Sequence, residues 1–186
     1  MKNFLPLILI IFIYKGCAPS PSRLATSDPA LLVTQADSLL AARPDDVDLR
    51  SSIIKARLNL AEANNDMNQY EAVLKMDPRN GTANYHIHMA KGKVHYKKGH
   101  KNGQWDAIQS FAKAVAAIDS LGAPHYWLGQ AYEKKDEMDF ELPLEAYDKA
   151  LNLYLPQDIH TLIIANREAL VTVSYTHLTL PTKRIV

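Results

Sequence analysis

Apolar residues recur at helical spacing along most of the chain, and short polar turns with proline or glycine interrupt them. A first helix is predicted from Asp28, which suits an N-cap, with Pro29 in its first turn and an apolar stripe that ends at Leu40. The later stretches with this periodicity are residues 47–64, 70–76, 82–98, 105–118, 127–132, 146–151 and 156–170. The pattern therefore predicts an all-α protein.

Two turn sequences recur at a fixed distance. Pro44 and Pro78, one in each turn, lie 34 residues apart, and an amphipathic run precedes each turn. A period of 34 with a helix on either side of every turn is typical of a helical-hairpin repeat. One hairpin cannot bury its apolar face alone and must stack on its neighbours, so the period predicts a solenoid. Solenoids offer curved binding surfaces rather than enclosed reaction chambers.

Two later hairpins share a small residue on the first helix, with an aromatic residue and an alanine on the second. The matching residues are Leu128, Gly129, Tyr132, Tyr147 and Ala150, with Gly92, Phe111 and Ala114 one repeat earlier. This pattern resembles the tetratricopeptide repeat (TPR) family. The resemblance implies a right-handed superhelical solenoid of antiparallel helix pairs over residues 28–171, with about three full repeats and a half unit at each end. The glycines would let the paired helices approach closely, and the aromatic rings would fill the space beyond them.

The N-terminus has the pattern of an export signal. Met1–Asn3 is positively charged and an apolar run, Phe4–Tyr14, follows. As a helix this run spans roughly 16 Å, too short for about 30 Å of bilayer hydrocarbon. The only cysteine, Cys17, follows Gly16 and resembles a bacterial lipoprotein processing site. We therefore expect a signal peptide at 1–16 and a lipidated cysteine with a flexible tether at 17–27; a plain secretory signal or a buried cysteine is the alternative.

The last residues of the chain resemble a sequencing artefact rather than part of a natural protein. Residues 172–182 match, residue for residue, the peptide encoded by a transposase-type sequencing-library adapter. Residues 172–186 are therefore expected to be an artefact, with the natural protein truncated near Val171. The preceding stretch, 156–170, would be the first helix of another repeat.

Composition and motifs argue against several function classes. The formal net charge of +1 provides no global field for nucleic acid, and one cysteine excludes an intrachain disulfide. The chain contains no glycine-rich phosphate loop, nucleophile elbow or metalloprotease helix motif, so neither an enzyme nor a cofactor is expected. Asp136–Glu141 is acidic but is expected to face solvent. Trp105 and Trp127 are expected to be packing residues.

Four histidines, His86, His88, His95 and His100, are close together in the sequence. None of them has the i, i+4 spacing of a helical zinc pair. His86 and His88 would point about 200° apart on a helix, and His88 and His95 would be roughly 10 Å apart along its axis. Surface histidines are therefore expected rather than a metal site, although a small-ligand or metal binder using this cluster remains an alternative.

The TPR resemblance implies that a partner peptide lies along the concave surface formed by the first helices. The residues that this places on or near the groove are Lys55, Lys93, Tyr96, Lys97, Tyr126, Gln130 and Lys134. Lysines beside tyrosines suit an acidic peptide or a C-terminal carboxylate, because ammonium groups donate charge-assisted hydrogen bonds and the rings offer apolar contacts. A solvated lysine face is the simpler interpretation.

Together these features predict a non-catalytic protein-interaction or scaffold module of the bacterial cell envelope. It would be exported, held on the membrane by a lipid at Cys17 and facing the periplasm or the cell exterior, with a protein or peptide partner and no nucleic acid. An alternative is the N-terminal helical part of a longer envelope protein whose enzymatic or glycan-uptake region is missing.

Overall fold

The computed structural model describes residues 19–99 and 101–179, with no account of the side chains at 101, 102 and 176–179. The chain divides into two compact units, Met1–Ala56 and Arg57–Val186, and each is described by itself. The expected signal peptide, Cys17 and His100 lie outside the described residues.

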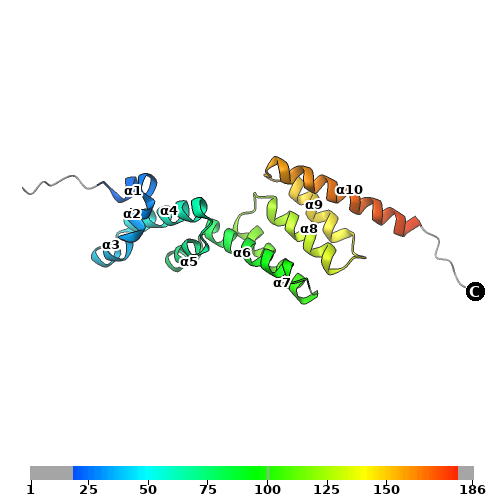
Figure 1. Cartoon of the computed structure of the whole chain (residues 1–186), viewed down its shortest axis with the longest axis horizontal. Coiled ribbons are helices and arrows are strands. Elements are labelled where there is room, and N and C mark those ends of the chain that lie inside the picture. The colour runs from blue at the N-terminus through cyan, green and yellow to red at the C-terminus, as the bar shows by residue number, and fades with distance from the viewer. Residues whose placement is uncertain (1–18, 100, 180–186) are drawn as a thin grey trace, which may run out of the picture. The chain divides into compact units, whose positions relative to one another are not determined.

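The described part of the chain folds into helices, without a strand, which confirms the all-α prediction. No helix within it is long and apolar enough to span a bilayer. The helices are α1 (Pro21–Ser27), α2 (Pro29–Thr34), α3 (Ala36–Ala42), α4 (Val47–Asn64), α5 (Met67–Met76), α6 (Gly81–Lys97), α7 (Lys101–Ala117), α8 (Ala123–Lys135), α9 (Glu141–Leu151) and α10 (Gln157–Thr179). Their order is shown in Figure 1.

The first unit contains α1 to α3 and the beginning of α4. Asp28 caps α2 as predicted, because its carboxylate accepts a hydrogen bond of 3.0 Å from the Leu31 amide and Pro29 occupies the first turn. The helix does not run unbroken to Leu40, however, because α2 ends at Thr34 and α3 begins at Ala36. Gln35 has φ −94° and ψ −3° and separates α2 from α3, although Leu32 and Ala36 on either side are both buried.

Part of the expected tether is helical. Ser20 accepts a hydrogen bond from the Arg23 amide and Pro21 lies in the first turn of α1. An N-cap serine and a proline in the first turn are both helix-start signals. The proline- and serine-rich composition of this stretch instead indicated a flexible segment. Ala25 of this helix is fully buried.

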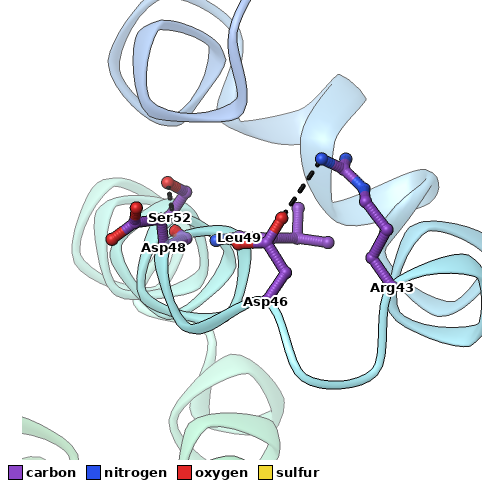
Figure 2. Close-up of polar contacts among 5 residues, drawn as sticks. All are labelled: Arg43, Asp46, Asp48, Leu49 and Ser52. Atoms are coloured by element: carbon purple, nitrogen blue, oxygen red, sulfur yellow. Dashed lines mark hydrogen bonds and ion pairs between the residues drawn. The ribbon is translucent and has the colours of Figure 1, made fainter.

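The predicted turn at Pro44 joins α3 to α4, and Asp46 organises it (Figure 2). One carboxylate oxygen of Asp46 accepts a hydrogen bond of 2.8 Å from the Leu49 amide at the start of α4. The other oxygen pairs with the Arg43 guanidinium at 3.2 Å. Asp46 thus satisfies an orphan amide at the start of α4 while the Leu49 side chain enters the core.

In the second unit each helix packs against the next one along the chain, from α5 to α10. Figure 1 shows α8, α9 and α10 side by side. The predicted end of α6 is confirmed by Gly99, whose φ of +77° is the left-handed conformation of a C-terminal glycine. The loop expected up to Gln104 is shorter than predicted, because α7 begins at Lys101.

The two helical hairpins α6–α7 and α8–α9 are closed by glycine–aromatic contacts. A Cβ added to Gly92 would lie 2.4 Å from the ring of Phe111, and one added to Gly129 would lie 2.4 Å from the ring of Tyr147. Both rings are fully buried. The predicted close approach of the paired helices is therefore present at both positions.

The last helix, α10, continues beyond its predicted end at Leu170 and reaches Thr179. No proline or glycine interrupts the sequence before Pro181, so nothing local ends the helix at Leu170. Ile163 of α10 is fully buried in a cluster with Tyr126, Tyr147 and Ala150. The adapter origin of residues 172–186 stays a prediction, because a helix can continue through sequence of either origin.

Substituting Gly129 by alanine is expected to lower the free energy of unfolding by about 1–3 kcal/mol, because the new methyl group overlaps the Tyr147 ring. At an unobstructed helix position the same change would stabilise the protein by about 1 kcal/mol. Urea unfolding, monitored by circular dichroism, measures the sign of this change in the free energy of unfolding. In a Tyr147→Ala background the alanine should be tolerated, and a stabilising Gly129→Ala in the parent would contradict the contact.

Candidate functional site

Six of the seven predicted groove residues belong to α6 and α8 of the second unit. Lys55 is exposed on the part of α4 that belongs to the first unit, so it is described separately from them. The α6 residues are Lys93, Tyr96 and Lys97, and the α8 residues are Tyr126, Gln130 and Lys134.

Tyr96 of α6 contacts two residues of α8, Gln130 and Lys134. Its hydroxyl donates to the Gln130 side-chain oxygen at 3.5 Å. The Lys134 ammonium donates to the Tyr96 carbonyl at 3.1 Å and lies 4.3 Å from the centre of the Tyr96 ring. That carbonyl is in the last turn of α6, where carbonyls lack helical partners and attract positive charge. Lys134 therefore holds α8 against the end of α6.

Trp127 joins this surface although it was expected only to pack. Its ring centre lies 5.5 Å from that of Tyr96, nearly edge-on at 74°, and 5.8 Å from that of Phe111. The Lys93 ammonium is 5.4 Å from the Trp127 ring centre, within range of a cation–π interaction. Trp127 is half-buried, so it forms a floor under Lys93. The sequence did contain a signal for this, because Trp127 is three residues before Gln130 and residues at this spacing share a helix face.

The remaining predicted residues differ in access. Tyr126 is only 8% exposed and packs with Tyr147 and Ile163, so it supports the site from beneath rather than facing a partner. Its hydroxyl accepts a hydrogen bond of 3.5 Å from Asn166 of α10. Lys97 is exposed. We call Lys93, Tyr96, Lys97, Trp127, Gln130 and Lys134 the basic–aromatic face.

A buried hydroxyl fixes the underside of this face. The Gln130 amide donates to the Tyr147 hydroxyl at 2.5 Å, and that hydroxyl donates to the Glu133 carboxylate. Burial of the ring, followed by the hydrogen bond to Glu133, raises the pKa of Tyr147 far above its usual value of 10. The phenol therefore stays protonated and links α9 to two residues of α8.

The described histidines of the predicted cluster, His86, His88 and His95, have different surroundings. The ring of His86 stacks on Tyr70 of α5 with centres 4.5 Å apart, and His95 lies 3.7 Å from a carboxylate oxygen of Asp106. Burial is the main cause that lowers the pKa of His86 and of His88. Within residues 19–99 and 101–179, no three His, Cys, Asp or Glu side chains form a group that could hold a metal ion.

Two further expectations concern Trp105 and the acidic stretch Asp136–Glu141. Trp105 is 47% exposed, so it is not the core residue that was expected; Lys135 covers its ring at 4.2 Å. Asp136 accepts a hydrogen bond from the Met138 amide in the α8–α9 turn, and Asp139 accepts one from the Leu142 amide at the start of α9. They also line a cleft of about 220 Å³ with Glu133 and residues of α10, which the sequence did not indicate.

Comparisons with protein-family models, with curated proteins and with solved structures found no match to this chain.

Replacing Tyr147 by phenylalanine is expected to lower the free energy of unfolding by about 1–3 kcal/mol, because Gln130 and Glu133 lose a buried partner. The loss should depend on pH. The folded-state pKa is raised, so this stabilisation is complete below pH 10 and is lost as the pH rises above it. Urea unfolding is measured at about pH 8 and about pH 11. The difference in free energy of unfolding between parent and variant should be smaller at the higher pH. A difference that grows with pH would contradict this account.

Proposed function

We propose that the basic–aromatic face binds an acidic segment of a partner protein, without chemistry on that partner. The single observation that carries the proposal is the arrangement of the exposed Lys93 and Lys97 beside the half-buried rings of Tyr96 and Trp127. Ammonium groups attract carboxylates, and aromatic rings provide contact area with little loss of conformational entropy.

The two lysines are placed to contact neighbouring groups of an extended segment. They are one helical turn apart on α6, so their backbone positions are separated by roughly 6 Å. Both lysines are exposed to solvent, and Lys93 lies above the Trp127 ring. A partner carboxylate at Lys93 would therefore approach next to an apolar surface, where charge-assisted hydrogen bonds are stronger than in open water.

The face is also held in a defined geometry before any partner binds. Lys134 is bound to the Tyr96 carbonyl, Gln130 accepts from the Tyr96 hydroxyl, and Tyr147 anchors Gln130 from below. Side chains fixed by other residues lose less entropy on binding, which favours affinity. Gln130 and Lys134 thus organise the face, and Lys93 and Lys97 provide the charge that selects the partner.

A TPR-like solenoid is the finer fold that we propose. The recurrence of a glycine–aromatic contact in α6–α7 and again in α8–α9 supports it, as does the packing of each helix on the next in the second unit. In such repeats the first helices of successive hairpins line one surface, which would place α6 and α8 together on the binding side.

The cellular setting is proposed from the N-terminal sequence. The apolar run 4–14 followed by Gly16 and Cys17 supports export and lipidation at the membrane of the cell envelope. Two or more acyl chains on one cysteine would be sufficient for stable anchoring. The binding unit would then act at the membrane surface, capturing its partner as a scaffold.

The charge-reversing pair Lys93→Glu and Lys97→Glu is expected to weaken binding of acidic peptides at least about tenfold, because it turns attraction into repulsion. The probe is a set of labelled decapeptides with mixed Asp, Glu and Tyr, measured by fluorescence anisotropy. Lys91→Glu with Lys98→Glu is the matched control, since both lysines are exposed on or next to the same helix and the net charge change is equal. Equal weakening in both pairs, or none in either, would rule out the face as the site.

The substitution Cys17→Ser is expected to release the protein from the membrane fraction, because the thiol that would carry the lipid is removed. Cell fractionation and labelling with a fatty-acid analogue measure this in a bacterial host. Retention of the parent's label in Cys17→Ser would exclude this cysteine as the lipidated residue.

A further inference from the structure

A second cleft, of about 400 Å³, lies at the start of α6 and the end of α7 and shares no residue with the basic–aromatic face. We propose that this cleft binds a small molecule bearing a phosphate group, with Arg79 and Lys113 as the residues that hold the phosphate. Its volume is within the range of about 300–1,000 Å³ that is usual for small-ligand sites.

The two charged residues that line the cleft are both basic. Arg79 and Lys113 line it, and no aspartate or glutamate is among its lining residues. The ion pairs found within the described part of the chain involve other side chains, so neither cation is neutralised by a salt bridge there. A planar guanidinium and a lysine ammonium together suit a phosphate, because the first can bind two oxygens and the second adds a compact charge.

The turn that carries Arg79 is held by its own hydrogen bonds. The Asn84 amide donates to the carbonyls of Pro78 and Asn80, both at 3.0 Å. Asp77 accepts from the Arg79 amide at 3.2 Å and from the Asn80 side chain at 3.3 Å. Of Arg79, these contacts involve the backbone amide and not the guanidinium. The amide at the start of α6 is already capped by Asn80, so the proposed ligand depends on side chains.

One wall of the cleft is set by a close approach of backbones. A Cβ added to Gly81 would lie 2.9 Å from the Ala117 carbonyl, so the beginning of α6 and the end of α7 are in direct contact. Pro78, Ala116 and Ala117 provide the apolar part of the lining. A charged group at Arg79 and Lys113 combined with a short carbon chain over these residues describes a small phosphate ester.

His88 lines the same cleft, and the charges near it change the pKa of its imidazole. Burial, and then the positive charges of Lys113 and Lys91, lower the pKa of its imidazole. The side chain is therefore neutral near pH 7 and can donate or accept a hydrogen bond. A phosphate placed beside Lys113 would oppose this effect, which makes His88 a reporter of occupancy.

The test uses the full chain carrying Cys17→Ser and titrates it with glycerol phosphate by calorimetry. Arg79→Gln and Lys113→Gln are each expected to weaken binding about tenfold or more, since each removes a charged contact. Lys91→Gln is the matched control, because it removes a nearby charge that does not line the cleft. In the parent, proton NMR should show the pKa of His88 rising when glycerol phosphate is bound.

A second arm separates a free phosphate ester from a lipid headgroup. Vesicles of phosphatidylglycerol and of phosphatidylcholine are compared for sedimentation with each variant. Binding only to phosphatidylglycerol, lost in Arg79→Gln and Lys113→Gln but kept in Lys91→Gln, would assign the headgroup as the source. Saturable binding of glycerol phosphate with the same dependence would assign a free ester. No saturable binding in either arm, or equal loss in Lys91→Gln, would overturn the proposal, and neither result depends on acidic peptides binding elsewhere.

Discussion

The contact between a glycine on one helix and an aromatic ring on the next determines the rest of the second unit. At Gly92 with Phe111 and at Gly129 with Tyr147 the ring occupies the space of a side chain, so the two helices of each hairpin have one permitted separation. The same rings then serve a second purpose. Phe111 stacks on Trp127, and the Tyr147 hydroxyl binds Gln130. The basic–aromatic face is therefore built on the hairpin contacts.

Magnitudes explain why glycine is tolerated in the middle of these helices. Relative to alanine, a glycine at an interior helix position costs about 1 kcal/mol. Burying an aromatic ring removes about 150–250 Å² from water, worth roughly 4–6 kcal/mol at 25 cal/mol per Å². Since Phe111 and Tyr147 are fully buried only because Gly92 and Gly129 leave them room, the burial outweighs the local cost.

Much of the fold could be predicted because its signals are local. The N-cap at Asp28 and the helix over Val47–Asn64 depend on neighbouring residues, and both were found in the structure. The break at Gln35 has no such signal, because the buried residues on both sides keep a helical spacing. The overall solenoid and the TPR resemblance stay predictions.

The candidate site was less accessible to sequence reasoning, because its geometry comes from contacts between distant residues. The position of Lys134 over the Tyr96 ring and carbonyl joins α8 to the end of α6. The TPR resemblance implied that Tyr126 lies near a groove but could not show that α10 covers it, since that depends on Ile163 and Asn166. Trp127 was treated as a packing residue because spacing alone does not distinguish a buried ring from a half-buried one.

A chain with 21 basic and 20 acidic residues presents basic surfaces because the two kinds of charge are used differently. Several aspartates accept hydrogen bonds from backbone amides at helix starts and turns, namely Asp28, Asp46, Asp66, Asp77, Asp136 and Asp139. These carboxylates are held at the junctions between helices, where they satisfy orphan amides. Lysines such as Lys93, Lys97 and Lys113 project instead from the helices themselves. Net charge therefore says little about which ligands a helical chain of this kind attracts, because these six of its 20 acidic residues are held at helix starts and turns rather than on the basic–aromatic face.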